Sequence, residues 1–192
     1  MTRIIAGFAG SLALAVPKSG TRPTSDRVRE AIFSALEAAD AIDGANVLDL
    51  FAGSGALGLE AASRGAAEVQ LVERDQKAAG IAGRNARLVA AAAAGSAPRI
   101  HVAAAPVASW LGGAVAVPHW DLAFLDPPYD LGDAALTAVL AALVPTLREG
   151  ATVVVERSNR SPAPEVPVGL EHVRSRSYGE TAVHWLERAD AN

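Results

Sequence analysis

Residues 47–58 read Val47-Leu-Asp-Leu-Phe-Ala-Gly-Ser-Gly-Ala-Leu-Gly58, and this stretch decides the predicted fold. An apolar run suited to one buried strand breaks into closely spaced glycines, and apolar residues then resume at helical spacing. Glycine tolerates positive φ angles and lets a ligand approach the backbone closely. The stretch therefore predicts a strand, a tight turn and a helix, with backbone N–H groups of the turn facing a ligand.

The identity of that ligand depends on two carboxylates. The glycines match G-x-G-x-x-G, and Glu73 follows Gly53 by about 20 positions, the spacing of a dinucleotide site. Asp49, however, precedes the turn where a dinucleotide would place its pyrophosphate, and the two anions would repel each other. The sulfonium and ammonium groups of S-adenosylmethionine would be attracted instead, while Glu73 can accept hydrogen bonds from ribose hydroxyls of either ligand. We therefore expect S-adenosylmethionine, with a cofactor site made of Asp49, Phe51, Gly53, Gly55, Glu73 and Arg74.

Length and composition limit the classes of protein that fit. A chain of 192 residues with 51% hydrophobic content can bury one good core, so we expect a single domain over residues 1–192, with residues 1–24 as an appended hairpin and arm. There is no cysteine, and the four histidines lack a paired ligand spacing, so no metal site is predicted. The sequence has no apolar run of ~18 residues and no secretory start, which predicts a cytoplasmic protein.

Charge is distributed unevenly along the chain. The formal net charge is −4, which disfavours non-specific coating of nucleic acid. Residues 1–30 are nevertheless basic, because this segment contains five basic residues and only two acidic ones. The basic residues are Arg3, Lys18, Arg22, Arg27 and Arg29, and the acidic ones are Asp26 and Glu30. This segment could hold a phosphate backbone locally, although a solvated helix face explains the same charges.

The rest of the chain alternates predicted strands with predicted helices, the rhythm of an α/β fold. A short hairpin and an amphipathic helix come first, Gly150 is predicted to stop the last helix, and an antiparallel strand pair at the sheet edge closes the chain. The expected strands are 3–6, 11–16, 47–51, 69–73, 99–103, 121–125, 152–156, 171–177 and 181–187; the expected helices run from the cap residues 24–26 to 40, and over 57–63, 76–92 and 134–147.

Asp126-Pro127-Pro128-Tyr129 follows a predicted strand and should lie beside the glycine turn, because open α/β sheets bind ligands at the carboxyl ends of their strands. Two prolines hold a rigid turn without N–H donors. The Asp126 carboxylate and the Pro127 carbonyl can accept the two hydrogens of an exocyclic amino group, and Tyr129 can stack on the base. The predicted catalytic residues are Asp126, Pro127 and Tyr129.

Six stretches together resemble one known family. They are Arg3-Ile-Ile-Ala-Gly7, Arg22-Pro-Thr-Ser-Asp-Arg-Val-Arg-Glu-Ala-Ile-Phe33, Leu48-Asp-Leu-Phe-Ala-Gly-Ser-Gly-Ala-Leu-Gly58, Glu73, Asp126-Pro-Pro-Tyr129 and Tyr178-Gly-Glu-Thr181. They resemble the bacterial RsmD family, methyltransferases of the N2 amino group of one guanine in small-subunit ribosomal RNA. The resemblance implies a Rossmann-like class I methyltransferase with a seven-stranded, mostly parallel sheet, an antiparallel C-terminal pair and a small N-terminal hairpin.

The resemblance implies small-subunit ribosomal RNA as the substrate. Because the net charge is −4 and the basic segment is short, we expect that RNA to be held within a partly assembled subunit. We also expect a monomer that binds neither a membrane nor a metal. The RNA contacts are predicted at Arg22, Thr24, Arg27, Tyr129 and Tyr178.

Two features depart from the family pattern, and three other functions stay open. The first glycine is followed by Phe8-Ala-Gly-Ser-Leu12 where members usually carry basic residues, and Ala103 to Ala105 offer no polar side chain to adenine. The alternatives are another DNA or RNA amino-group methyltransferase, an NAD-dependent dehydrogenase and a non-catalytic ribosome assembly factor. The dehydrogenase is disfavoured by Asp49, and the assembly factor would leave residues 126–129 unexplained.

Overall fold

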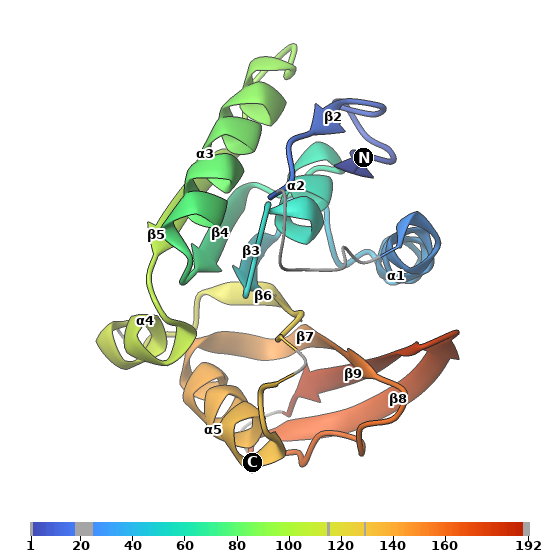
Figure 1. The fold of residues 1–192 in the computed structure, drawn as a ribbon, viewed down its shortest axis with the longest axis vertical. Helices are drawn as coiled ribbons and strands as arrows, with labels where there is room; N and C mark the ends of the chain where they lie inside the picture. The colour runs from blue at the N-terminus through green and yellow to red at the C-terminus, as the bar shows by residue number, and fades with distance from the viewer. Residues whose placement is uncertain (1, 18–24, 115, 129, 190–192) are drawn as a thin grey trace.

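The computed structural model describes residues 2–17, 25–114, 116–128 and 130–189. Its centre is a seven-stranded sheet of order β5-β4-β3-β6-β7-β9-β8, in which β3 to β7 run parallel and β9 runs antiparallel to both of its neighbours (Figure 1). This confirms the predicted α/β sheet with an antiparallel C-terminal pair. The strands are β3 Asn46–Leu50, β4 Glu68–Glu73, β5 Arg99–Ala104, β6 Trp120–Leu125, β7 Leu147–Ser158, β8 Leu170–Tyr178 and β9 Thr181–Arg188.

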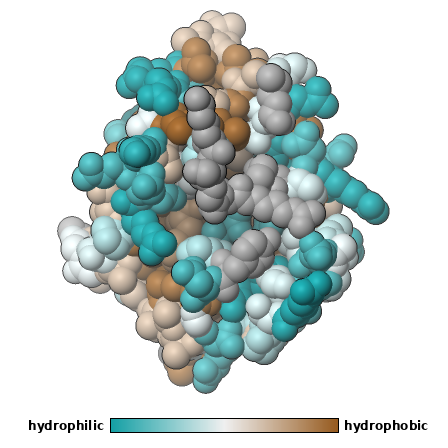
Figure 2. Space-filling model, in the orientation of Figure 1, coloured by the Kyte–Doolittle hydropathy of each residue, from teal (hydrophilic) through white to brown (hydrophobic). Residues whose placement is uncertain are grey.

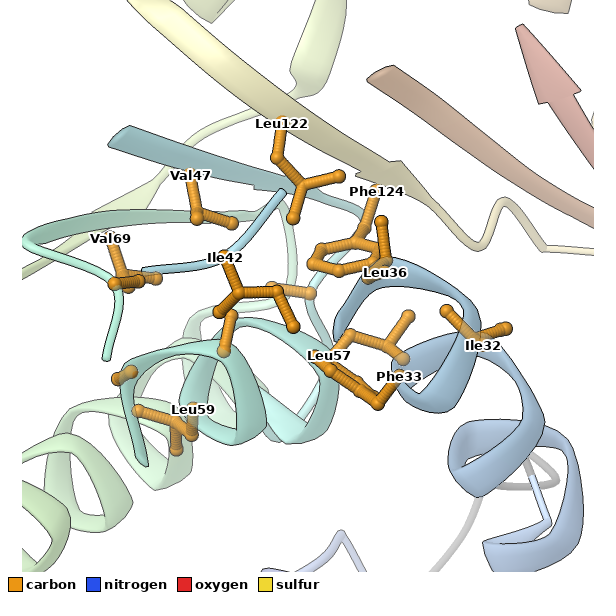
Figure 3. Packing of buried hydrophobic residues seen from close by; sticks show 14 of the residues in the cluster. Ile32, Phe33, Leu36, Ile42, Val47, Leu57, Leu59, Val69, Leu122 and Phe124 are labelled. Carbon is orange, nitrogen blue, oxygen red and sulfur yellow. The ribbon is translucent and has the colours of Figure 1, made fainter. Parts of the chain in front are cut away.

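Helices cover both faces of this sheet. One hydrophobic cluster fills the face under α1, α2 and α3, and a second fills the face under α4 and α5. Alternate residues of the central strands serve the two clusters, since side chains of a strand point to opposite faces. In the first cluster, the Phe124 ring of β6 lies 5.6 Å from the Phe33 ring of α1, centroid to centroid, and Val47, Leu122 and Leu36 belong to the same cluster (Figure 3). The helices are α1 Asp26–Ala38, α2 Ala56–Ser63, α3 Gln76–Ala91, α4 Val107–Gly113, α5 Asp133–Leu143 and the 3-10 helix η1 Val144–Thr146.

The N-terminal hairpin packs on α2. Its strands, β1 Thr2–Arg3 and β2 Ala13–Leu14, are shorter than the sequence predicted. Gly7 has a φ of +81°, and a Cβ there would lie 1.9 Å from the Ser63 carbonyl oxygen, so a larger residue would push the hairpin off the helix. Between β1 and β2 the chain packs against α2, where the Phe8 N–H donates to the Ser63 carbonyl, and the paired part of the hairpin is therefore short.

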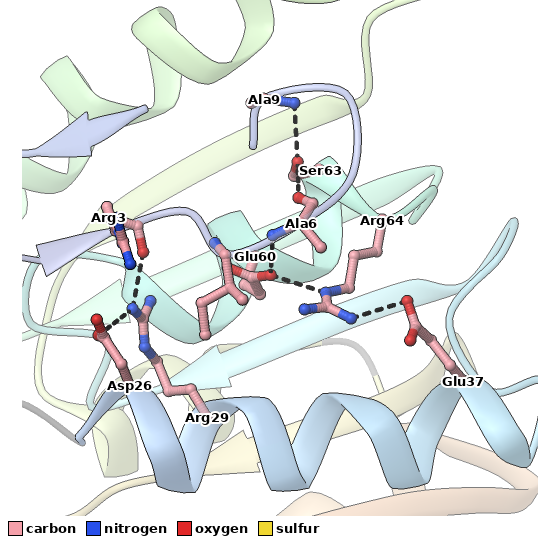
Figure 4. Close-up of polar contacts among 10 residues, drawn as sticks. Arg3, Ala6, Ala9, Asp26, Arg29, Glu37, Glu60, Ser63 and Arg64 are labelled. Carbon is pink, nitrogen blue, oxygen red and sulfur yellow. Dashed lines mark hydrogen bonds and ion pairs between the residues drawn. The ribbon is translucent and has the colours of Figure 1, made fainter. Parts of the chain in front are cut away.

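Buried polar groups of α2 hold the hairpin and α1 in place (Figure 4). The fully buried Glu60 carboxylate accepts hydrogen bonds from the N–H groups of Ile5, at 2.7 Å, and Ala6, at 3.0 Å. It also pairs with the Arg64 guanidinium, which reaches Glu37 of α1 at 2.8 Å. A buried carboxylate with several charge-assisted partners fixes the three elements relative to one another.

One element between β5 and β7 was missed, and one prediction there was wrong. Helix α4 was missed because its seven residues give too little periodic signal. The last helix was predicted to run to Leu147 and stop at Gly150, but α5 ends at Leu143, and the chain continues into η1, which contains Pro145. Gly150 instead lies inside β7 with a φ of +71°, beside the register shift between Trp120 and Leu122 of β6. Its positive φ serves this irregularity of the strand.

The surface carries apolar side chains singly and in small groups, with hydrophilic side chains between them on the face that Figure 2 shows. In the part of the chain that the structure describes, no helix is both long and apolar enough to cross a membrane. Among the described residues, the large apolar side chains that are exposed are Phe8, Val16, Leu88, Val117, Val168 and Val173.

Candidate active site at the carboxyl edge of the sheet

Four carboxylates stand in a row at the carboxyl ends of adjacent strands. Glu73 ends β4, Asp49 lies near the end of β3, Asp126 follows β6, and Glu156 lies near the end of β7. The residues two positions before them belong to the cluster under α1 to α3, so the four side chains share that face. Those preceding residues are Leu71, Val47, Phe124 and Val154.

Asp49 is the most deeply buried of the four. Its Oδ2 accepts the Gly58 N–H of α2 at 2.8 Å, and the side chain is 1% exposed. Burial raises the pKa of Asp49 to about 7, the hydrogen bond from Gly58 opposes that rise, and the charges of Asp126 and Glu73 add to it. The carboxyl group can therefore gain or lose its proton near neutral pH, and a cation beside it would favour the ionised form.

The glycine turn is shaped by left-handed backbone. Phe51, Gly53 and Gly55 have φ angles of +65°, +55° and +84°. Phenylalanine rarely adopts this conformation, which stores strain of roughly 1–3 kcal/mol, and its ring is held by the cluster under α4 and α5. A Cβ at Gly53 would meet nothing within 4 Å, so glycine is needed there only for its φ. Three left-handed residues thus turn the chain from β3 into α2.

Glu73 supports this turn from the neighbouring strand. Its Oε2 accepts the Gly53 N–H at 2.9 Å, and its Oε1 accepts the Asp75 N–H at 2.8 Å. Each carboxylate oxygen can accept a further hydrogen bond. The carboxylate is therefore already oriented toward the turn and keeps acceptor capacity for hydroxyl donors of a ligand.

Asn85 of α3 connects the turn to the N-terminal segment. Its Nδ2 donates to the Ser54 carbonyl at 2.9 Å and to the Ala15 carbonyl at 2.9 Å, while its Oδ1 accepts the Ala15 N–H at 3.0 Å. The side chain is fully buried. One amide thus fixes the distance between the glycine turn and the end of the hairpin.

The turn that contains Asp126 is anchored from β7. The Pro128 carbonyl accepts the Leu131 N–H at 2.9 Å, and Arg157 donates to the Leu131 carbonyl at 2.9 Å and to Asp133 Oδ1 at 2.7 Å. Pro127 is buried and Asp126 is partly exposed. A small pocket opens here, lined by Asp126, Pro127, Glu156, Arg157, Ser158 and Ser161.

The structure places the predicted carboxylates Asp49, Glu73 and Asp126 at the carboxyl ends of the adjacent strands β3, β4 and β6. The other predicted side chains lie around this group. Arg74 is exposed after β4, and Arg27 is exposed in the first turn of α1. Tyr178 is partly buried at the end of β8, against the cluster under α1 to α3. Arg22, Thr24 and Tyr129 were also predicted, but they lie outside the described residues.

Sequence reasoning missed three residues of this site: Glu156, Arg157 and Asn85. Glu156 ends the apolar part of a strand just as Glu73 does, so the same signal could have identified it. Arg157 and Asn85 act through contacts with residues 24 or more positions away, and local pattern carries no trace of such contacts.

The strand end near Ala103 to Ala105 offers few donors. β5 ends at Ala104, and the Ala105 N–H is already bonded to the Glu73 carbonyl at 3.0 Å. An adenine ring at this end of the sheet would therefore need a partner other than that amide. Across the described residues, no group of three or more His, Cys, Asp or Glu side chains is placed to hold a metal ion.

Comparison with known proteins gives consistent results along nearly the whole chain. A family model described as Conserved hypothetical protein 95 matches residues 2–187. The Ribosomal RNA small subunit methyltransferase D of Escherichia coli K12 is 37% identical over 187 residues, which cover 97% of this chain and 89% of the relative.

Solved structures share the fold. The Escherichia coli protein yhhF superimposes with a TM-score of 0.83 at 34% identity, covering 98% of both chains. Magnesium protoporphyrin IX methyltransferase from Synechocystis, solved with bound S-adenosylmethionine, gives a TM-score of 0.64 at 15% identity, over 88% of this chain and 87% of that one. At that identity the second likeness concerns the fold alone, which is that of a class I methyltransferase.

Proposed function

The chain belongs to the RsmD family, and on that premise we propose that it is an S-adenosylmethionine-dependent methyltransferase of the exocyclic N2 amino group of a guanine in small-subunit ribosomal RNA. Relatives that carry a ribosomal RNA methyltransferase name support the RNA substrate. The observation that carries the guanine assignment is the pair of carboxylates, Asp126 and Glu156, at adjacent strand ends.

The residues around the glycine turn fit S-adenosylmethionine. Glu73 is oriented by two backbone N–H groups and can accept the vicinal ribose hydroxyls. Asp49 lies one strand away, and its ionised form would be stabilised by a sulfonium or ammonium cation. When bound, the cofactor supplies an electrophilic methyl group. A pyrophosphate at the same place would be repelled by the carboxylates of Asp49, Glu73 and Asp126.

Asp126 and Glu156 match the donor pattern of guanine. The register that pairs Leu125 with Val155 places Asp126 and Glu156 next to each other, about one strand spacing (~4.8 Å) apart. Guanine presents two neighbouring donors on its Watson–Crick edge, the N2 amino group and N1–H. Adenine presents one amino donor beside an acceptor nitrogen, which would face a carboxylate unfavourably. Asp126 is proposed to accept from the amino group and Glu156 from N1–H.

The roles of these residues in the reaction follow from their geometry. Asp126 holds one amino hydrogen and thereby turns the nitrogen lone pair toward the methyl group. As nitrogen gains the methyl carbon, it loses a proton, which the Asp126 carboxylate can accept. Arg157 keeps the turn rigid through Leu131 and Asp133, so that Asp126 need not reorganise during the transfer.

The substrate is proposed to be a partly assembled small subunit rather than naked RNA. The net charge is −4, so a broad cationic surface for gripping free RNA is lacking. Ribosomal proteins could hold the target loop with its base unstacked, which would remove a flipping cost of a few kcal/mol. Arg27, exposed at the start of α1, is proposed to contact the RNA.

The test is methyl transfer in vitro. Small subunits from cells that lack the gene are incubated with the protein and methyl-labelled S-adenosylmethionine, and the RNA is digested to nucleosides for mass analysis. The proposal expects label in N2-methylguanosine with wild type, and an initial rate lower on the order of 10²-fold or more with Asp126→Ala. Label in another nucleoside would favour a different amino-group methyltransferase, and calorimetric binding of NAD in place of the sulfonium cofactor would favour a dehydrogenase.

A further inference from the structure

A stripe of cationic and aromatic side chains runs along the edge strand β8. Arg174, Arg176 and Tyr178 occupy alternate positions, so they point to one face of the sheet. Their partners across the ladder to β9 are Trp185, Val183 and Thr181. Trp185 and Val183 belong to the cluster under α1 to α3, so the stripe lies on the same face as the four carboxylates.

The stripe is level with the candidate active site. Glu156 of β7 pairs with Val183 of β9, and Val183 pairs with Arg176 of β8. Arg176 is therefore two strand spacings, about 10 Å, from Glu156 along one row of the sheet. Because β8 runs parallel to β7, Tyr178 lies at the active-site edge and Arg174 lies farther from it. Figure 1 shows α1 and the β8–β9 pair on the same side of the molecule.

The two guanidinium groups are available to an anion. Arg174 lies over the Trp185 ring, 4.5 Å from its centroid, which holds the side chain in place. Arg174 Nε is buried and has no hydrogen-bond partner. Within the described ranges, neither Arg174 nor Arg176 forms an ion pair, whereas Arg64, Arg148 and Arg157 all do.

We propose that Arg174, Arg176 and Tyr178 form a track for the RNA strand that flanks the target nucleotide, with the arginines on phosphates and Tyr178 nearest the base. The inference rests on the proposed function, since it places the RNA that enters at Asp126. The anionic backbone complements this track and would be repelled by the row of carboxylates beside it. The strand therefore leaves the pocket across β9 toward β8, away from Asp49 and Glu73.

An edge strand can also carry charges simply to prevent pairing with another chain. That explanation accounts for charge at any position along the strand. It does not account for the confinement of both arginines to the face that leads to the active site, or for the stacking of one on a tryptophan.

The experiment compares arginine variants on undermethylated small subunits as substrate. Arg176→Glu and Arg176→Ala change an exposed side chain, and Arg174→Lys keeps the charge but loses the planar stack. Arg84→Glu is the matched control, because Arg84 is exposed on α3, at the other end of the sheet. Initial rates give kcat and KM at several salt concentrations, and thermal unfolding checks the fold of each variant.

The track predicts that Arg176→Glu raises KM about tenfold with little change in kcat, and that the slope of log(kcat/KM) against log salt becomes shallower by about one for Arg176→Ala. Arg84→Glu should match wild type in KM. Unchanged KM and an unchanged salt slope in the Arg176 variants would overturn the inference. Aggregation of Arg176→Glu, with the kinetics of its monomeric fraction equal to wild type, would also overturn it, because the arginine would then serve only to prevent edge pairing. A wild-type protein that methylates no RNA would instead refute the proposed function itself, and the track would fall with it.

Discussion

Replacing Asp49 by Asn should remove a pH dependence of cofactor binding that wild type shows below neutrality. In the unliganded protein, burial raises the pKa of Asp49 to about 7. A cationic cofactor favours the ionised carboxylate, so binding must release the proton whenever Asp49 holds one. Affinity for S-adenosylmethionine should therefore increase as pH rises toward 7 and then level off.

The magnitude follows from the fraction of Asp49 that is ionised. One pH unit below its pKa, about a tenth of the group carries the charge, so the apparent Kd should be about tenfold weaker than its limit at high pH. At the pKa itself the weakening should be about twofold. An asparagine cannot ionise, so the Kd of Asp49→Asn for the cofactor should be independent of pH over the same range and weaker than the wild-type limit at high pH.

The assay is isothermal titration in buffers of different ionisation enthalpy, from about pH 5.5 to 7.5. The upper limit keeps the cofactor's α-amino group mostly protonated. Wild type should release about half a proton per cofactor near pH 7, and Asp49→Asn should release none. S-adenosylhomocysteine, which lacks the sulfonium charge, shows which of the two cations Asp49 senses. A wild-type Kd that does not vary with pH, or the same profile in Asp49→Asn, would refute the reasoning.

Asp49 should also make the free energy of unfolding depend on pH. Its pKa in the folded protein exceeds the ordinary value of 3.8, so the folded state binds more protons between these values. The contribution of Asp49 to the free energy of unfolding is therefore fully present below about pH 4 and is lost as pH rises through about 7. The difference is on the order of 4 kcal/mol. Urea unfolding of wild type and Asp49→Asn across this range measures it.

Three further outcomes are expected. Asp126→Ala should lower kcat on the order of 10²-fold or more with the cofactor Kd nearly unchanged, and Asp126→Asn should retain more activity because its amide oxygen still accepts a hydrogen bond. Timed methyl-transfer assays measure kcat, and calorimetric titration measures Kd. Near wild-type turnover of Asp126→Ala would exclude Asp126 from the chemistry. Gly58→Ala should lower the free energy of unfolding by roughly 1–3 kcal/mol, because a Cβ there would lie 2.4 Å from Leu71 Cδ2. Gly80→Ala should raise it by roughly 0.5–1 kcal/mol, because Gly80 lies on α3 with open space around its Cβ position. Equal melting temperatures of the two variants would contradict this. Glu60→Gln should increase hydrogen exchange at the N-terminal hairpin, because an amide has one acceptor oxygen where the carboxylate has two; unchanged protection there would show that the hairpin is held by other contacts.

The parts of the fold that the sequence predicted are those whose signal is local. The strand and turn of residues 47–58 follow from an apolar run and glycines, and Gly58 shows why: its close approach to Leu71 and Val69 leaves no room for a Cβ. Asp126 was placed beside the turn by a general property of parallel sheets, without any measured distance. Each of these features lies within a few residues of the sequence pattern that predicted it.

The parts that were missed depend on contacts between distant residues. Glu60 and Asn85 hold the hairpin and the glycine turn across separations of 31 to 70 positions, and nothing near them in the sequence marks this role. Gly150 was read as a helix stop because a glycine after a helical pattern usually is one, but here its positive φ serves an irregular strand. The cationic face of β8 becomes visible only when the ladder to β9 shows which residues share it.

The central claim is that this protein methylates guanine N2 in small-subunit ribosomal RNA. The most direct measurement is mass mapping of that RNA from cells that lack the gene, beside the same cells complemented with wild type or with Asp126→Ala. We predict the loss of one N2-methylguanosine, its return with wild type, and its continued absence with Asp126→Ala. An unchanged set of N2-methylguanosines in the deletion strain would contradict the claim.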